Sequence, residues 1–296
     1  MKITFGVLFL LLGSLSVQAQ FLSQQKNLQT QQGFFTFHYN ESKDEIYLEV
    51  DKLDSEFLYV NSLRTGLGSN DIGLDRGKLG NEKVVKFVKA GDKLLLVQPN
   101  QKYRAVTDNP AEKKSVEEAF ARSVLFGFPI KETKGQVYVI DLTPFLLQDT
   151  YGVAETLKKS KQGNFSFDNS RSAQHMERTK SFPKNSELEA LITLSGNGAG
   201  NWLKSVAPDD AHVSVIQHHA FVELPDADFQ PRIYDPRSGS YPFTYMDYST
   251  PVSSDINKRF ITRHRLKKKD PNAAVSGAVE PIVYYLDPGT PEPVRS

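Results

Sequence analysis

Residues 33–50 read GFFTFHYNESKDEIYLEV, and this stretch decides the fold class. Aromatic side chains crowd residues 33–39, and residues 45–50 alternate between polar and apolar side chains. Such alternation is typical of a strand with one buried face. Because the polar connection 40–44 is short, the sequence predicts an antiparallel hairpin here.

Further strand signals follow along the chain. Residues 83–89 and 93–98 flank Ala90-Gly91-Asp92, where a glycine suits the positive φ of a tight turn. Residues 160–187 are polar and lack periodicity, which predicts a long connection. The remaining strands are expected at residues 56–60, 137–142, 189–194, 212–224, 259–266 and 282–286.

One helix has a clear beginning. Asn109 can cap it, Pro110 suits its first turn and Glu112 completes a capping box. Apolar and small residues then lie on one face at four-residue spacing, which predicts a helix reaching residue 127: Val116, Phe120, Val124 and Gly127. A weaker helical pattern covers residues 144–159. The predicted fold class is therefore α+β, mostly antiparallel β-sheet with two helices.

The composition excludes several kinds of protein. Of the 296 residues, 39% are hydrophobic and 24% charged, which is typical of a globular chain with a core. A net charge of +1 creates no global field that would attract nucleic acid. The absence of cysteine excludes disulfides, cysteine nucleophiles and thiolate zinc sites.

Residues 1–19 have the features of a signal peptide. Lys2 supplies the positive charge, residues 3–12 are mainly apolar, and Val17-Gln18-Ala19 fits a cleavage site. The apolar run is too short for a transmembrane helix, which needs about 20 residues. We therefore expect an exported protein, periplasmic, outer-surface or secreted, with no membrane span.

The glycine cluster at residues 65–73 is a weak candidate for a phosphate-binding loop. Asp71 stands where the dinucleotide pattern requires a third glycine, and no Lys-Ser/Thr pair follows as in a P-loop. We interpret the segment as a structural loop in which Asn70, Asp71, Asp75 and Arg76 bond the backbone.

His218 and His219 are the only adjacent histidine pair. Neighbouring side chains of a strand point to opposite faces, so the two cannot readily share a metal ion. We favour hydrogen-bonding histidines over the alternative of metal ligands. Ser195 lacks the glycine of a nucleophile elbow two positions earlier and is expected in a loop. No His-Glu-x-x-His motif occurs in the sequence.

A basic stretch lies near the end of the chain, comprising Arg259, Arg263, Arg265 and residues 267–269. A strand would place the three arginines on one face. Because the whole chain is nearly neutral, we favour a solvated face or an interdomain contact over a polyanion site.

An ordered series of segments is more specific than any single motif. It comprises FLYV (57–60), TGLGSNDIGLDRG (65–77), VQPN (97–100), YRA (103–105), RTKSFPKN (178–185), QHH (217–219), FVELP (221–225), YMDY (245–248), RHRL (263–266) and KKDPNAA (268–274). Together they resemble the N-terminal region of a family of large secreted bacterial zinc-dependent metalloproteases. In that family an uncharacterised β-rich domain precedes a metzincin-like catalytic domain with His-Glu-x-x-His. The resemblance covers nearly everything after the signal peptide.

The resemblance also implies a domain layout. A polar lead-in at residues 20–32 would precede a β-rich accessory domain at 33–270, with an alternative division into two subdomains near 160–187. Residues 271–296 would be a linker and the start of a truncated catalytic domain, because PIVYYLDPGTP (281–291) resembles the segment that opens it. Residues 282–286 would then be a strand without its partners.

The function implied is that of a non-catalytic accessory domain of a secreted zinc-dependent metalloprotease. No catalytic, cofactor-binding or metal-binding residue carries over, and zinc is expected only in the catalytic domain, which would be the partner. By family the protein would be a metalloendopeptidase, yet this chain is expected to be inactive alone. The alternative is an independent extracytoplasmic module that binds a glycan or protein through Tyr241, Phe243, Tyr245 and Tyr248.

Overall fold

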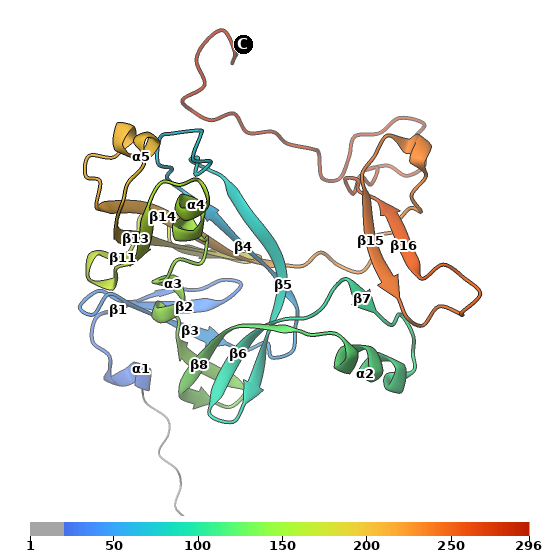
Figure 1. Cartoon of the computed structure of the whole chain (residues 1–296). Coiled ribbons are helices and arrows are strands. Elements are labelled where there is room, and N and C mark those ends of the chain that lie inside the picture. Colours follow the sequence, from blue (N-terminus) through green and yellow to red (C-terminus); the bar gives the residue numbers. More distant parts are fainter. Residues whose placement is uncertain (1–20, 296) are drawn as a thin grey trace, which may run out of the picture. The chain divides into compact units, whose positions relative to one another are not determined.

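The computed structural model describes residues 21–295 and shows an α+β protein dominated by antiparallel strands (Figure 1). This confirms the predicted fold class. The described residues form two compact units: unit 1 comprises residues 21–99 and 121–224, and unit 2 comprises residues 100–120 and 225–295. Residues 160–187, where the sequence placed a division, lie inside unit 1. The predicted signal peptide at 1–19 lies outside the described residues.

The first half of the sheet in unit 1 contains the predicted hairpin. Its antiparallel strands β2 (Thr36–Asn40) and β3 (Glu45–Val50) pair from Thr36↔Glu49 to Asn40↔Glu45. The other members follow the order β1-β2-β3-β9-β8-β6, with β1 (Leu28–Gln31), β9 (Val137–Asp141), β8 (Ser123–Lys134) and β6 (Lys93–Gln98).

The long strand β5 (Leu79–Ala90) joins the two halves of this sheet. Its first part pairs with β4 (Phe57–Leu63), and its second part pairs with β6 across the predicted Gly91 turn. The second half continues through β14 (His212–Glu223), β13 (Asn185–Asn197) and β10 (Asn164–Phe167). Within the predicted connection 160–187, β10, β11 (Ala173–Gln174) and β12 (Lys180–Phe182) all pair with β13.

The described residues contain five α-helices rather than two. α2 (Pro110–Ala119) begins as predicted, with the Asn109 side chain accepting a hydrogen bond from the Ala111 N–H at 3.0 Å. The predicted continuation to residue 127 is wrong, because residues 123–129 form β8 and pair with β6. The other helices are short: α1 (Phe21–Gln24), α3 (Thr143–Leu146), α4 (Val153–Lys159) and α5 (Asn201–Val206). The single helix predicted at residues 144–159 is thus replaced by two short helices, α3 and α4. Short 3-10 helices occur at η1 (Asn169–Arg171) and η2 (Pro236–Ser238).

Phenylalanines fill the core between the two halves of the sheet. Phe35 is 1% exposed and meets Phe57 of β4, Phe87 of β5 and Phe221 of β14 at ring-centroid distances of 5.2, 5.8 and 6.0 Å. Edge-on aromatic contacts of this kind add stability beyond the burial of apolar area. The core therefore ties the first strands to strands more than 150 residues later.

Unit 2 is a smaller assembly around a three-stranded sheet. β15 (Pro242–Asp247) pairs antiparallel with β16 (Asn257–Ile261) and parallel with the two-residue β7 (Tyr103–Arg104). Among its described residues only Val116 and Asp247 are buried. Residues 282–286 form no strand, although the sequence predicts one.

No helix in the described part of the chain has the length and apolar character needed to cross a membrane.

Candidate functional site

The segment 282–286 is the most exposed apolar stretch of unit 2. Its five side chains range from 43% exposed for Ile282 to 92% for Tyr285. Val283, Tyr284 and Tyr285 favour extended backbone, so the segment has the composition of a strand while none of the described strands pairs with it. An apolar, strand-forming segment left in water is a site for pairing with another chain.

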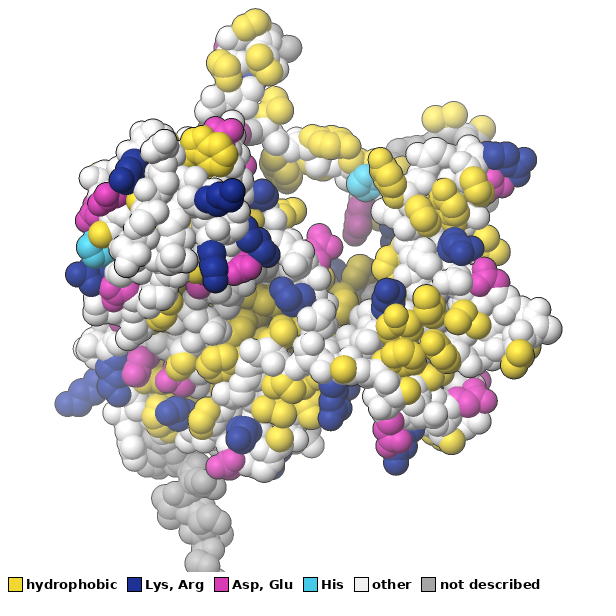
Figure 2. All heavy atoms as spheres, in the orientation of Figure 1, with side chains coloured by type: hydrophobic (Ala, Val, Ile, Leu, Met, Phe, Trp, Pro, Cys, Tyr) yellow, Lys and Arg dark blue, Asp and Glu magenta, His cyan; other side chains and the backbone are white. Residues whose placement is uncertain are grey.

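A second exposed surface is the aromatic face of the sheet in unit 2. Phe243 and Tyr245 lie two residues apart on β15, and the Phe243 and Tyr245 rings are 6.5 Å apart. The guanidinium of Arg104 lies 4.5 Å from the Tyr245 ring centroid, and Phe260 stacks on Tyr245 at 6.0 Å. Figure 2 shows hydrophobic side chains at the surface of this unit. We call Arg104, Phe243, Tyr245 and Phe260 the aromatic face.

The four aromatics named from the sequence do not form one surface. Phe243 and Tyr245 belong to the aromatic face, whereas Tyr248 packs on Phe120 at 5.1 Å. Phe120 in turn stacks on Tyr103 at 4.1 Å. Tyr241 is 87% exposed and precedes β15.

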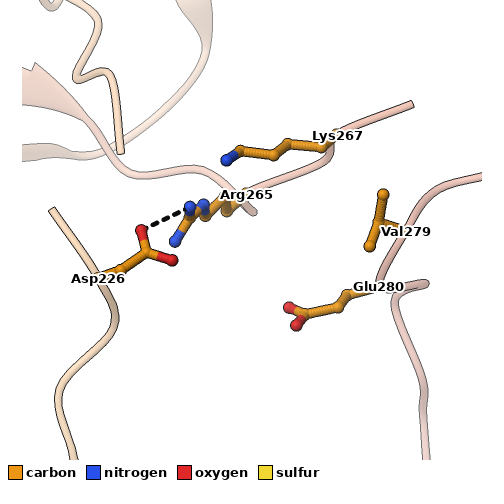
Figure 3. Close-up of a pocket in the computed structure, with 5 residues that line it drawn as sticks. All are labelled: Asp226, Arg265, Lys267, Val279 and Glu280. Atoms are coloured by element: carbon orange, nitrogen blue, oxygen red, sulfur yellow. Dashed lines mark ion pairs between the residues drawn. The ribbon is translucent and has the colours of Figure 1, made fainter. Parts of the chain in front are cut away.

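A polar pocket lies where the end of unit 2 folds back on itself (Figure 3). Lys269 donates its N–H to the Gly277 carbonyl, and Val279 donates to that of Lys267, each at 2.8 Å. Arg265 points into the pocket and pairs with Asp226 at 2.7 Å, with Lys267, Val279 and Glu280 completing the lining.

Acidic partners neutralise much of the basic stretch. Arg259 pairs with Asp255 at 3.3 Å, and Lys267 pairs with Asp228 at 3.2 Å. The hydrogen bond from Arg265 holds the pKa of Asp226 below its usual value. The arrangement therefore favours a locally balanced surface over a polyanion site.

His218 and His219 point to opposite faces of β14, as strand alternation predicts. On one face, His218 Nε2 lies 2.6 Å from Glu187 Oε2, and its Nδ1 lies 3.2 Å from Glu189 Oε1. His175 Nδ1 approaches the other Glu189 oxygen at 2.8 Å. Glu189 is completely buried, and Arg64 Nε lies 3.8 Å from its carboxylate.

The electrostatics of this cluster fit a structural role. Burial alone would lower the pKa of His218, but hydrogen bonds and charge interactions with Glu187 and Glu189 raise it overall. For Glu187, burial acts to raise the pKa, and the bonds to His218 and Asn185 lower it overall. Because His175 precedes β12, its bond to Glu189 fastens the segment around β11 and β12 onto the sheet.

His219 belongs to a buried polar network on the core face. Its Nδ1 hydrogen-bonds the Tyr59 hydroxyl at 2.9 Å, and burial lowers its pKa from 6.5 to about 3. Asn61 Nδ2 donates to Thr150 Oγ1 at 3.1 Å, and that hydroxyl donates to Gln217 Oε1 at 2.7 Å. The ring is therefore neutral at ordinary pH.

Backbone hydrogen bonds hold the glycine-rich loop at 65–77. The Leu67 N–H donates to the Leu74 carbonyl at 2.9 Å, and the Gly77 N–H donates to that of Leu63 at 2.7 Å. Ile72 and Leu74 are buried in the core of unit 1. Backbone hydrogen bonds and the burial of Ile72 and Leu74 thus fix the conformation of the loop.

Replacing Gly66 by alanine is expected to destabilise unit 1 by about 1–3 kcal/mol, the usual cost of overpacking. A Cβ atom there would lie 2.5 Å from the Arg76 nitrogen and 2.7 Å from the Leu74 oxygen, so the loop backbone must shift. Urea unfolding measures the change. The control is Gly277→Ala, where the nearest atom would be 3.9 Å away. Equal stability of the two variants would contradict the close packing of this loop.

Ser195 lies in β13 and not in the predicted loop. Its hydroxyl donates to Asp168 Oδ2 at 2.6 Å. Asp168 also accepts from Ser170 and Arg171, and the hydrogen bonds from Ser170 and Ser195 lower its pKa. The Ser195 hydroxyl is therefore part of a hydrogen-bond network around Asp168, next to η1.

Among residues 21–295, no group of three or more His, Asp or Glu side chains has the geometry to hold a metal ion. Several buried or half-buried polar groups were not foreseen from the sequence, among them Glu189 and Lys83. Lys83, Val85 and Phe87 occupy alternate positions of β5 and therefore share one face of the strand. This alternation could have predicted that the Lys83 amine points inward.

Two family models match the chain. One described as Domain of unknown function (DUF5117) matches residues 77–269, more than half of the chain, and one described as Domain of unknown function (DUF5118) matches residues 24–66. No curated protein and no solved structure matches.

Proposed function

Since this chain belongs to the DUF5117 family, whose description names no activity, we propose a function from its own residues: it is the non-catalytic accessory region of a secreted zinc-dependent metalloprotease. The ordered segments from residue 57 to residue 274 support this proposal through their resemblance to that protease family. Export directed by residues 1–19 is part of the same proposal.

The exposed segment 282–286 is the observation that carries the proposal. In an extended conformation Val283 and Tyr285 share one face, and Ile282, Tyr284 and Leu286 share the other. A strand with apolar residues on both faces is typical of the interior of a sheet covered on both sides. The segment thus has the pattern of a strand that completes a catalytic domain's sheet, and zinc would be held in that domain.

The double variant Val283→Asp/Tyr285→Asp is expected to weaken binding to a catalytic domain at least tenfold. The domain would come from a protease of the resembled family that carries His-Glu-x-x-His, expressed as a separate polypeptide that starts after its own copy of this segment. Two carboxylates on one strand face would be buried without partners, which is costly. Isothermal titration calorimetry measures the affinity.

The matched control is Val252→Asp/Val275→Asp, which places the same charges at two exposed valines of unit 2 outside the segment. It should bind like the unchanged chain. No association of the unchanged chain, or equal loss in both double variants, would overturn the proposed role of residues 282–286.

The aromatic face supports a second candidate function, an independent binding module. Aromatic rings flanked by an arginine are common in recognition surfaces. Binding of a glycan or peptide array by the chain alone, lost in Phe243→Ala/Tyr245→Ala but kept in Val283→Asp/Tyr285→Asp, would favour this module over the accessory role.

A further inference from the structure

An amine points toward the core side of the sheet in unit 1. Lys83 of β5 pairs directly with Tyr59 of β4, and its side chain shares a face with Val85 and Phe87, which are buried. Lysine is uncommon at an inward-facing strand position, because even partial burial of an ammonium group is costly. Its placement therefore calls for a physical explanation.

Lys83 lines a cavity of about 220 Å³ in unit 1. The walls come from four separate elements: Tyr59 of β4, Lys83 of β5, Leu125 of β8 and Phe145 of α3, with Gln148 and Thr150 following α3. The lining combines apolar surface from Leu125, Phe145 and the Tyr59 ring with polar groups from Lys83 and Thr150, which we call the polar wall.

The Lys83 ammonium has no carboxylate within ion-pair distance among residues 21–295. Its Nζ lies 5.6 Å from the Tyr59 ring centroid and donates a hydrogen bond to the Asn81 carbonyl at 3.4 Å. Burial lowers the pKa of this amine, with no acidic neighbour to offset it. The site thus offers a positive charge that the surrounding side chains leave uncompensated.

The polar wall is backed by incompletely bonded groups. Asn61 donates to Thr150, and Tyr59 bonds His219, yet the Asn61 Oδ1 and His219 Nε2 atoms are buried without a hydrogen-bond partner in the described structure. Buried polar atoms are rarely left in this state. Unused hydrogen-bonding capacity therefore lies behind Tyr59 and Thr150, on the buried residues to which they are bonded.

We propose that this cavity binds a small organic carboxylate, whose charged group pairs with Lys83 and whose apolar part lies against Leu125 and Phe145. Charge-assisted bonds between an amine and a carboxylate are about twice as strong as neutral ones, and partial exclusion of water strengthens them further. The cavity is smaller than the 300–1,000 Å³ typical of drug-sized ligands, so a ligand with one ring or a short alkyl chain fits it. This site does not depend on the proposed accessory role.

Benzoate and hexanoate are suitable probes, and benzamide is the uncharged counterpart of benzoate. Saturation-transfer NMR on the full chain should show binding of both carboxylates and at least tenfold weaker binding of benzamide. Lys83→Met keeps an apolar stem and removes the charge, and it should weaken benzoate binding at least tenfold. Leu125→Trp keeps the charge but fills the apolar part, and it should abolish binding of both carboxylates.

The matched control is Lys86→Met on the opposite face of β5, where the lysine pairs with exposed Asp54 at 3.5 Å. Lys86→Met should bind benzoate like the unchanged chain. The proposal is overturned if neither carboxylate binds, if benzamide binds equally well, or if Lys83→Met and Lys86→Met lose affinity to the same extent. Circular dichroism of each variant verifies that the sheet is intact.

Discussion

Replacing Phe35 by alanine is expected to lower the free energy of unfolding of unit 1 by about 3–5 kcal/mol, the usual cost of removing a buried aromatic side chain. Phe35 contacts four phenylalanine rings that come from four places in the chain: Phe34, Phe57, Phe87 and Phe221. The substitution therefore removes apolar burial and leaves a cavity where the halves of the sheet meet.

Chemical denaturation followed by far-ultraviolet circular dichroism measures this loss. Because Phe182 is 45% exposed, Phe182→Ala is the matched control and should cost less than about 1 kcal/mol. A loss of under 1 kcal/mol for Phe35→Ala would show that the two halves of the sheet do not depend on this aromatic cluster.

The Phe35 cluster also marks the limit of what the sequence could predict. The alternation at residues 33–50 is a local signal, and it correctly predicted the hairpin of β2 and β3. By contrast, Phe221 pairs with Tyr59, which lies 162 positions earlier in the chain. No local pattern specifies which distant strand becomes a neighbour, so the sheet order was not predictable.

Helix α2 shows how a correct local signal can be extended too far. The cap at Asn109 is a backbone requirement and correctly marked the beginning. The four-residue spacing of Val116, Phe120 and Val124 fitted a longer helix, but Val124 pairs with Val97 of β6 in a sheet. Strand pairing with β6 thus overrode the helical period.

At the polar sites, too, features set by neighbouring residues were predictable from the sequence, whereas features set by distant segments were not. Strand alternation correctly separated His218 from His219, because it depends only on neighbouring positions. For Glu189, by contrast, the sequence did not show that the segment carrying His175 would cover its side chain. The carboxylate of Glu189 is covered by His175, which lies in the segment between β11 and β12.

His219 should make unit 1 less stable as the pH falls from about 6.5 toward 3. Burial lowers the pKa of the folded-state ring from 6.5 to about 3, so over this range the unfolded chain binds a proton that the folded protein excludes. Stability changes by about 1.4 kcal/mol per pH unit for each proton bound differently. The melting temperature should therefore fall steadily across this window.

His218 and Glu187 change the stability of unit 1 mainly outside the range from pH 4.5 to 6.5. His218 has a raised pKa, so its contribution is fully present below 6.5 and is lost only as the pH rises through the raised value. Glu187 has a lowered pKa, so its contribution is present above 4.5 and is lost only as the pH falls through the lowered value. Between pH 4.5 and 6.5, the slope from these three groups belongs to His219.

His219→Gln separates this effect from general acid denaturation. Glutamine keeps an oxygen that can accept from the Tyr59 hydroxyl but cannot take up a proton. The variant should lose a slope that grows from about 0.7 kcal/mol per pH unit at pH 6.5 to about 1.4 kcal/mol per pH unit near pH 5. If His219→Gln and the unchanged chain had parallel stability curves in this window, the folded protein would take up a proton at His219 as readily as the unfolded chain does, contrary to the burial of that ring.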